Sequence, residues 1–292
     1  MMTENELNDR RFFPARQEVR FAEIDKSTPQ TRDPAYRLAF QDTDFLLREE
    51  LRPVRFQLEL LKTEMLLDEA NIASTLVIYG SARIPRPDQV EALLAGAQDD
   101  AARRTAERLA AKAHYYEEAR RLAFLASQCE QRDPGGQRHF VVCSGGGPSI
   151  MEAANRGAAD AGMESIGLNI VLPHEQAPNP YVTPSLSFQF HYFALRKMHF
   201  LLRARAVAVF PGGFGTFDEF FELLTLVQTG KMERLPILLF GKDFWGRVVN
   251  FEALAEEGTI SAEDLKLITP VETGDEAWAA IRAFYNLDCP AP

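Results

Sequence analysis

The sequence predicts an α/β protein with a doubly wound, mostly parallel sheet and a helical extension at the N-terminus. Two observations predict this class. After about residue 72, seven short apolar runs alternate with segments of helical periodicity, which is typical of parallel strands joined by right-handed crossovers. Several of these runs are β-branched and lack polar alternation, as expected for strands covered on both faces.

By prediction, the chain divides into an extension over residues 1–71 and a main domain over residues 72–292. Residues 1–35 are polar and lack periodicity, so we expect a flexible arm. Residues 34–71 carry apolar residues at helical spacing among charges. We expect helices there that pack on the main domain or on a partner chain.

The elements of the main domain follow from the same patterns. Strands are predicted at 74–80, 139–144, 165–172, 186–190, 205–210, 235–240 and 266–271. Helices are predicted at 98–129, 148–161, 193–204, 217–229, 243–254 and 275–286. Glycine-rich segments follow three of the strands: GSAR (80–83), SGGGPS (144–149) and PGGFGT (211–216). Because ligands of such sheets bind beyond the carboxyl ends of the strands, we expect these three loops to converge on one crevice.

Composition narrows the class of protein. The chain has 292 residues, of which 46% are hydrophobic and 25% charged, typical of a globular protein. It has no apolar stretch near the roughly 18 residues of a membrane span, and MMTENELNDRR lacks the apolar core of a secretory signal, so we expect a cytoplasmic protein without a membrane partner. The net charge of −10 argues against binding nucleic acid through a broad basic surface.

The cysteines give no sign of a metal site. Cys129, Cys143 and Cys289 are widely spaced, and none has a histidine or second cysteine at zinc-like spacing. We expect structural thiols in a reducing compartment and no bound metal.

One segment of this acidic chain contains no acid. From Gln176 to Phe217 there is no Asp or Glu, although six basic side chains fall there: His191, Arg196, Lys197, His199, Arg203 and Arg205. The pattern predicts a locally electropositive pocket for an anion. The alternative is a buried stretch that simply excludes acids.

The helix predicted at 193–204 lies within this segment. Its spacing predicts a buried stripe of Ala194, Leu195, Met198, Leu201 and Leu202. Arg196 and Lys197 would then lie off the core side, where a guanidinium suits phosphate or sugar hydroxyls. A solvated charged face is the structural alternative.

SGGGPS offers backbone amides at a strand-to-helix turn, which favours anion binding. It does not match the dinucleotide fingerprint GxGxxG, because Ile150 takes the third glycine position. A plain structural turn remains the alternative.

In PGGFGTFDEF, three glycines are expected to allow positive φ and a close approach of the backbone to a ligand. Thr216 is expected to cap a helix that begins at Phe217, and Glu219 would complete a capping box, which is a structural explanation for that acid. Capping alone does not require three glycines. We therefore expect a phosphate or sugar against the loop, with the carboxylate of Glu219 at its rim.

In this order and at these separations, GSAR, GGGPSIMEAANRGA, the Arg196–Lys197 pair and PGGFGTFDE resemble the Lonely Guy (LOG) family, whose members are often mislabelled lysine decarboxylases. The resemblance covers about residues 72–286. It implies a Rossmann-like fold and homo-oligomers, dimers or larger, with the site near a subunit interface. It also implies hydrolysis of nucleoside 5′-monophosphates, such as cytokinin ribotides or AMP, to free base and ribose 5-phosphate. No metal or other cofactor is required.

The resemblance makes Arg196 and Glu219 the catalytic pair. The substrate- and phosphate-binding residues that it implies are Ser81, Arg83, Gly146, Gly147, Lys197, Gly212, Gly213, Gly215 and Thr216. Phe193 and Phe200 stand where the family commonly has methionines, so the identity of the base stays open.

Glu219 would stabilise the positive charge that develops on the ribose as the base leaves. Because it is expected in the first turn of a helix, the helix dipole would favour its ionised form. Arg196 would hold the substrate and balance charge on the leaving side.

Two other functions remain as alternatives. One is a non-catalytic carrier of a nucleotide or of the molybdenum cofactor with the same fold, although the presence of both Arg196 and Glu219 counts against it. The other is a decarboxylase, which would need pyridoxal phosphate on a buried lysine. Lys197 and Lys231 are the lysines nearest the loops, and neither has a sequence context that suggests this.

Overall fold

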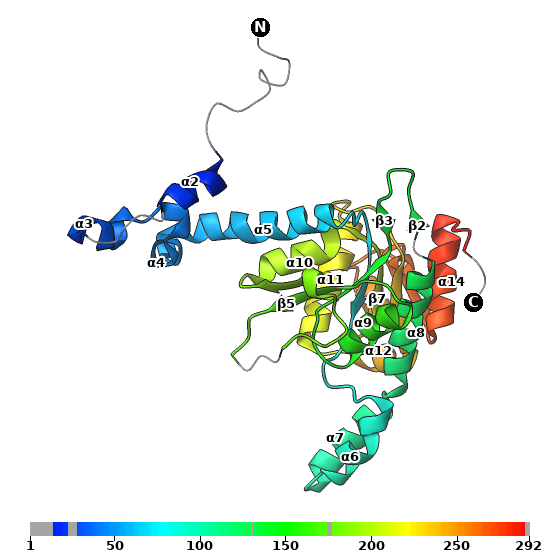
Figure 1. The fold of residues 1–292 in the computed structure, drawn as a ribbon. Coiled ribbons are helices and arrows are strands. Elements are labelled where there is room, and N and C mark those ends of the chain that lie inside the picture. The colour runs from blue at the N-terminus through cyan, green and yellow to red at the C-terminus, as the bar shows by residue number, and fades with distance from the viewer. Residues whose placement is uncertain (1–13, 23–27, 130, 174–176, 290–292) are drawn as a thin grey trace. The chain divides into compact units, whose positions relative to one another are not determined.

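The computed structural model describes residues 14–22, 28–129, 131–173 and 177–289 (Figure 1). MMTENELNDRR lies outside these residues. The chain divides into two compact units, residues 1–58 and residues 59–292.

The first unit consists of short helical segments in its described part. They are α2 (Ala15–Ala22), α3 (Pro29–Arg32), three 3₁₀ turns (Pro34–Tyr36, Ala39–Gln41 and Glu49–Leu51), α4 (Thr43–Leu46) and the beginning of α5 (Arg52–Glu69). Side-chain caps begin three of them: Thr28 accepts from the backbone N–H of Thr31, Asp33 from that of Ala35, and Asp42 from that of Phe45. The segment predicted as an arm therefore contains α2 and α3.

The second unit is built on a seven-stranded sheet in which every strand pair is parallel. Its strands are β1 (Thr75–Tyr79), β4 (Val141–Ser144), β5 (Ile166–Ile170), β6 (Ser187–Phe190), β7 (Ala204–Val209), β8 (Ile237–Phe240) and β9 (Ile268–Val271). Each overlaps one of the seven predicted strands. The predicted fold class is confirmed, and the continuous apolar runs are buried, as in β1 and β8.

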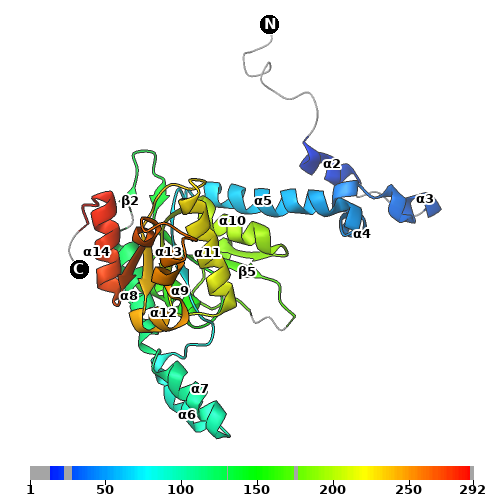
Figure 2. The same ribbon diagram turned by 180° about the vertical axis from the view of Figure 1, so that it is seen from behind.

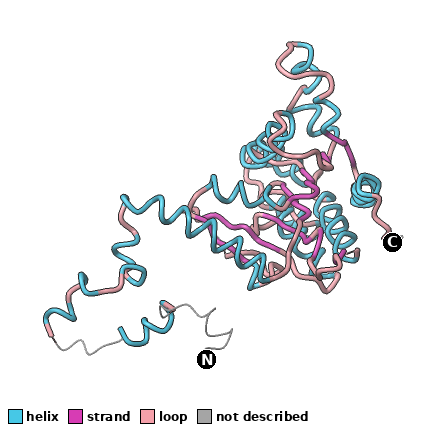
Figure 3. The backbone as a smooth tube through the Cα atoms, turned by 90° about the horizontal axis from the view of Figure 1, so that it is seen from above, coloured by secondary structure: helices cyan, strands magenta, loops and turns pink. Residues whose placement is uncertain are grey.

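The helices that follow β1 are α6 (Val90–Ala95), α7 (Asp100–Ala110), α8 (His114–Gln128), α9 (Ile150–Asp160), α10 (Phe193–Leu202), α11 (Phe214–Gln228), α12 (Lys242–Val248), α13 (Phe251–Glu256) and α14 (Gly274–Tyr285). Helices cover both faces of the sheet (Figures 2 and 3), whereas α6 and α7 extend away from it (Figure 2). On one face, α8 packs against α9 and α14 over a core that includes Leu122, Ile150 and Trp278. A short antiparallel hairpin, β2 (Gln131–Arg132) with β3 (Arg138–His139), was not predicted.

Two predicted helices are each divided into two. The helix predicted at 98–129 is α7 followed by α8, and the one predicted at 243–254 is α12 followed by α13. At the second division, Asn250 caps α13 by accepting from the N–H of Ala253. At the first, α8 buries much of its length whereas α7 buries only Ala106, so the two segments have different environments.

The strand order is β6-β5-β4-β1-β7-β8-β9. From β1 the chain first adds strands on one side, ending at β6, and then returns to add β7, β8 and β9 on the other. The direction therefore reverses beside β1, and a crevice opens there beyond the carboxyl ends of β1, β4 and β7. The three glycine-rich loops begin at these ends, as predicted.

The cysteine prediction is wrong for two of the three residues. Cys129, at the end of α8, and Cys289, after α14, form a disulfide with their Cα atoms 5.7 Å apart. They are 160 residues apart in sequence, so only the packing of α14 against α8 brings them together. Cys143 is free and buried in β4.

Candidate functional site

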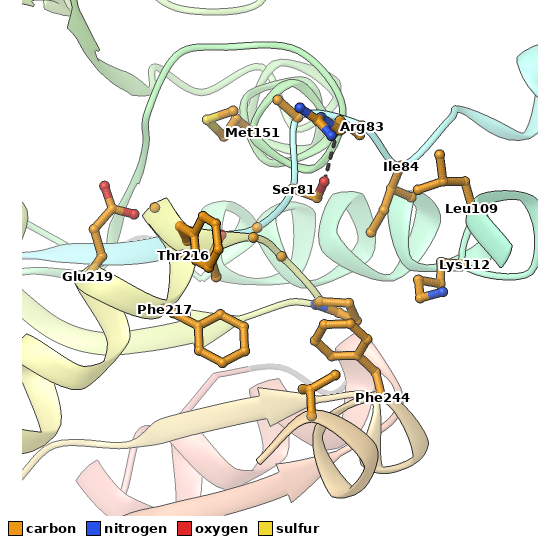
Figure 4. Close-up of a pocket in the computed structure, with 18 of the residues that line it drawn as sticks. Ser81, Arg83, Ile84, Leu109, Lys112, Met151, Thr216, Phe217, Glu219 and Phe244 are labelled. Carbon is orange, nitrogen blue, oxygen red and sulfur yellow. Dashed lines mark hydrogen bonds between the residues drawn. The ribbon is translucent and has the colours of Figure 1, made fainter. Parts of the chain in front are cut away.

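A cavity of about 860 Å³ lies at the crevice (Figure 4). Two loops form part of its wall: the loop after β1, and the loop after β7 together with the start of α11. Residues of α7, α9, α10 and α12, the end of β5 and Lys112 between α7 and α8 form the rest. The lining residues are Gly80 to Ile84, Leu109, Lys112, Met151, Ile170, Leu172, Phe193, Arg196, Pro211 to Phe217, Glu219, Phe244 and Val248.

Helix α11 presents uncapped backbone amides to this cavity. The helix begins at Phe214 with Gly213 at the N-cap, and no side chain caps it. The prediction that Thr216 caps a helix starting at Phe217 is therefore wrong. The first helical bond runs from the N–H of Phe217 to the carbonyl of Gly213. The N–H groups of Phe214, Gly215 and Thr216 thus lack helical acceptors, and all three residues line the cavity, which favours an anion there.

In this loop the protein's own packing requires glycine only at Gly212, and none of the three glycines has positive φ. Gly212, Gly213 and Gly215 are absent from the positive-φ residues of the described chain, so the φ prediction is wrong. A Cβ on Gly212 would lie 2.2 Å from Oγ1 of Thr216. A Cβ on Gly213 or Gly215 would meet no atom within 4 Å and would take up open space beside the cavity. The predicted close approach of a ligand to the backbone remains consistent with this geometry.

Arg196 and Glu219 form a largely enclosed ion pair at the cavity wall. Nη1 of Arg196 donates to Oε1 of Glu219 at 3.0 Å, and 11% and 14% of the two side chains are exposed. Nε of Arg196 donates to the carbonyl of Leu168 in β5 at 2.6 Å, and the guanidinium lies 4.9 Å from the ring centre of Phe200. A Cβ on Gly145 would lie 2.7 Å from Nη2, so the loop after β4 can approach the guanidinium because it has glycine there.

Helix α10 is rotated relative to its predicted orientation. Its buried residues are Leu195, Arg196, His199, Phe200 and Leu201, whereas Met198 and Leu202 are exposed. Ala194 is exposed as well, so the predicted stripe is wrong at Ala194, Met198 and Leu202, and Arg196 faces inward. Hydrogen bonds to Leu168 and Glu219, on other elements, offset the cost of burying the Arg196 charge. The spacing of apolar residues in the sequence does not reveal such partners.

Burial changes the acidity of Glu219. It raises the pKa of this carboxyl from 4.5 to about 7, against the opposing effect of the Arg196 charge. Burial likewise raises the pKa of Tyr79 and of Cys143, both of which interact electrostatically with Glu219. Glu219 is the sixth residue of α11, beyond the first turn, so the expectation that the helix dipole keeps it ionised is wrong. Near pH 7, both protonation states of Glu219 are populated.

The basic residues of the acid-free segment do not form one pocket. Of the six, Arg196 alone lines the cavity. Lys197 forms ion pairs with Asp218 at 3.1 Å and with Glu222 at 3.0 Å. Arg203 pairs with Glu64 and Asp68, and Arg205 lies 3.9 Å from Glu233. Acids of α5 and α11, distant in sequence, therefore neutralise much of the charge that the segment carries.

Carboxylates of α5 hold both ends of α10. Glu59 accepts from the N–H of His191 at 2.8 Å and of Tyr192 at 3.3 Å, just before the helix begins. At the other end, Glu64 lies 3.3 Å from Nδ1 of the buried His199. Burial lowers the pKa of His199, although Glu64 opposes this. This clamp, formed by Glu59, Glu64 and Asp68, fixes the helix that carries Arg196.

The SGGGPS loop is held by a buried polar network. Nδ2 of Asn179 donates to the carbonyls of Gly146 and Gly147 and to Oδ1 of Asn155. Asn155 also accepts from the hydroxyl of Ser144. Ser149 has φ 66° and ψ −124°, and its hydroxyl donates to the carbonyl of Ile84. The loops after β4 and β1 are thus tied together at a strained residue, which is typical of functional sites.

The cavity brings most of the predicted site residues together. Those that line it are Ser81, Arg83, Arg196, Gly212, Gly213, Gly215, Thr216 and Glu219. Gly146, Gly147 and Lys197 lie outside its lining. Sequence reasoning missed the contributions of α7 and α12 with the residues beside them, chiefly Leu109, Lys112, Phe244 and Val248. No motif marks these residues, and only the packing of distant segments places them here.

No helix in the described part of the chain has the length and apolar character needed to cross a membrane. Within the same residues, no group of three or more His, Cys, Asp or Glu side chains is arranged to hold a metal ion.

Comparisons with known proteins give a family and related folds. A family described as "possible lysine decarboxylase" matches residues 151–281. Two curated proteins of Arabidopsis thaliana, the cytokinin riboside 5′-monophosphate phosphoribohydrolases LOG2 and LOG3, are 26% and 25% identical to this chain over 132 and 139 residues. These matches cover 44% and 47% of this chain and only 60% and 63% of the relatives' own length.

Solved structures with low identity are also similar. The molybdenum cofactor binding protein of Rippkaea orientalis is 16% identical, with 73% of this chain and 97% of that one covered, at a TM-score of 0.43. The molybdenum cofactor carrier protein of Chlamydomonas reinhardtii is 20% identical, with 60% and 89% covered, at a TM-score of 0.39.

Proposed function

We propose that this chain, which belongs to the Lonely Guy family, hydrolyses the N-glycosidic bond of nucleoside 5′-monophosphates and releases the free base and ribose 5-phosphate. One observation carries the proposal. The uncapped amides of α11 and the enclosed Arg196–Glu219 pair line the same cavity. An anion site therefore lies beside a carboxyl group whose pKa is about 7.

The amides of α11 suit the phosphate end of such a substrate. A phosphate at the N-terminus of a helix accepts hydrogen bonds from free N–H groups and interacts favourably with the helix dipole. Gly213 and Gly215 leave room for it because they carry no Cβ. With the phosphate on this loop, the ribose extends toward Glu219, five residues further along the helix from Phe214.

The chemical step needs a group that moves a proton. Hydrolysis forms a bond between a water oxygen and C1′ and breaks the bond between C1′ and the base nitrogen, whose electron pair leaves with the base. The water loses a proton and the base gains one. Ionised Glu219 accepts the water proton and stabilises the positive charge on the ribose, and with a pKa of about 7 it can then return a proton to the base.

Arg196 positions this carboxyl group. It holds Oε1 of Glu219, while its own Nε is anchored on the carbonyl of Leu168. Oε2 of Glu219 has no hydrogen-bond partner in the part of the chain that the structure describes, which leaves it for water or substrate. The guanidinium also lowers the pKa of Glu219, so that a useful fraction is ionised at neutral pH.

The test is a base-release assay. The protein is incubated with the 5′-monophosphates of adenosine, guanosine, cytidine, uridine and isopentenyladenosine, and free base is measured by chromatography, with the unphosphorylated nucleosides as controls. We expect release from one or more monophosphates and loss of most turnover in Glu219→Gln. Glu233→Gln is the matched control, because Glu233 is an exposed acid outside the cavity lining.

Two outcomes would contradict the proposal. Turnover in Glu219→Gln close to that of the wild type would remove the catalytic role of Glu219. Tight nucleotide binding without any release of base would favour a non-catalytic carrier.

A further inference from the structure

The cavity continues past the start of α11 to an end with a different chemistry. In Figure 4, Thr216 lies between Glu219 on one side and Lys112, Leu109 and Phe244 on the other. Lys112 lies in the short connection between α7 and α8. Nothing in the sequence motifs points to this residue.

Lys112 is a cation without an anionic partner. Its ammonium group donates to the carbonyl of Arg108 at 2.6 Å and lies 6.0 Å from the ring centre of Phe244. Among the described residues, no carboxylate lies within ion-pair distance of it. Partial burial lowers the pKa of Lys112, and the charges of Arg247 and Arg108 lower it further.

Lys197 provides the contrast. It carries the same charge, but Asp218 and Glu222 both contact it and raise its pKa. An ammonium group that lines a cavity and has cations as its charged neighbours gains more from a bound anion than one that is already paired.

Arg83 adds a second cation to the same cavity. Its backbone N–H donates to the hydroxyl of Ser81, and its guanidinium has no ion-pair or hydrogen-bond partner within the described chain. Glu219 is the one acid among the lining residues, and Arg196 already pairs with it. The charges of Lys112 and Arg83 are therefore not balanced by a lining carboxylate.

We propose that Lys112, together with Arg83, which the family resemblance already implies as a phosphate-binding residue, binds the 5′-phosphate of the substrate on the side that faces away from the amides of α11. This inference rests on the proposed function and adds a recognition element to it. A phosphate monoester carries up to two negative charges, whereas the end of a helix supplies only about half a positive charge. Two full cations supply the remainder, and they distinguish a phosphorylated nucleoside from a neutral one.

Binding of ribose 5-phosphate tests this proposal without requiring turnover. Dissociation constants for ribose 5-phosphate and for ribose are measured by calorimetry with wild type, Lys112→Gln, Arg83→Gln and the control Lys231→Gln. Lys231 is exposed and lies beyond the far end of α11. We expect ribose 5-phosphate to bind at least tenfold more weakly to Lys112→Gln and to Arg83→Gln, with weak ribose binding unchanged and the control like wild type.

Two further measurements show whether a loss of affinity comes from the lost charge or from a loss of folding. Lys112→Arg should recover most of the affinity, because it restores the cation, and the loss in Lys112→Gln should shrink at high salt. Urea unfolding of each variant shows whether it is folded. Equal affinity of folded Lys112→Gln and wild type for ribose 5-phosphate at low salt would overturn the proposal.

Kinetics then separate this inference from the proposed function. If the monophosphates react, Lys112→Gln should raise KM at least tenfold with a smaller change in kcat, because the contact exists before and during the reaction. If wild type releases no base but its affinity for ribose 5-phosphate depends on Lys112, the proposed function fails and the phosphate site stands. If base is released and the affinity does not depend on Lys112, the reverse holds.

Discussion

Glu219→Gln should make the protein more stable at alkaline pH while it removes activity. The reason is the pKa of about 7 in the folded protein, compared with the ordinary value of 4.5. A raised pKa means that folding disfavours the ionised form. Stability linked to Glu219 is therefore fully present below about pH 4.5 and is lost as pH rises through 7.

The magnitude follows from the same two values. The difference between 4.5 and about 7 corresponds to about 3 kcal/mol, since one pKa unit is about 1.4 kcal/mol. Glutamine has the size and the neutral charge of protonated glutamate, and Arg196 is present in both cases. Glu219→Gln should thus exceed wild type in unfolding free energy by about 3 kcal/mol near pH 8, and by little at pH 4.5.

Urea unfolding at pH 4.5, 6 and 8 measures this difference, with Glu233→Gln as the control because its exposed side chain should give almost no change at any pH. The reasoning fails if Glu219→Gln is less stable than wild type at pH 8, or if its advantage does not depend on pH. A uniform loss of stability is what a capping role for Glu219 would produce, and the start of α11 at Phe214 already argues against that role.

Three other predictions follow from the site. In carbon NMR of labelled glutamate, the Glu219 carboxyl should titrate near pH 7 in wild type and at higher pH in Arg196→Met, because the guanidinium lowers the pKa of Glu219. An unchanged titration midpoint in Arg196→Met would contradict the pairing of the two side chains. Gly213→Ala should stay as stable as wild type yet bind ribose 5-phosphate at least tenfold more weakly, because its Cβ meets no protein atom. Gly212→Ala should destabilise the fold, because its Cβ would overlap Thr216. Similar thermal stability of the two variants would refute this difference between the two glycines. Asn155→Ala should lower the unfolding free energy by about 2 kcal/mol or more, measured in urea, because it removes the buried acceptor of the Ser144 hydroxyl and the donor to the carbonyl of Ile166. A change below about 0.5 kcal/mol would show that the network is not needed.

The sheet could be predicted because each strand is marked by a short apolar run in its own sequence. A run such as LVIY in β1 is apolar and β-branched at successive positions, and the sheet buries it on both sides. The glycine-rich loops were predictable for the same reason, since each directly follows such a run. Two of the three loops, GSAR and PGGFGT, line the cavity, as the rule for open α/β sheets predicts, whereas no residue of SGGGPS does.

The orientation of α10 could not be predicted from local pattern. Apolar spacing favoured a stripe through Met198 and Leu202, but the structure buries Arg196 and His199 instead. Their burial is tolerated because Leu168, Glu219 and Glu64 supply polar contacts from other elements. Such contacts between distant segments leave no periodic trace in the sequence.

The start of α11 and the acidity of Glu219 were mispredicted together. Treating every glycine of PGGFGT as loop moved the helix start to Phe217, yet Gly215 and Thr216 belong to the first turn. Glu219 then lies beyond the first turn and deeper than expected, where burial outweighs the charge of Arg196. The depth of a side chain below the surface depends on the whole fold, so neither effect could be read from the motif.

The clamp on α10 affects how this protein should be truncated. A fragment that begins at residue 72, the predicted boundary of the main domain, would retain all seven strands of the main sheet and the whole cavity lining. It would nonetheless lack Glu59, Glu64 and Asp68, leaving His199 and Arg203 without their acidic neighbours. Poor turnover by such a fragment would therefore report a loosened Arg196 rather than a missing catalytic group.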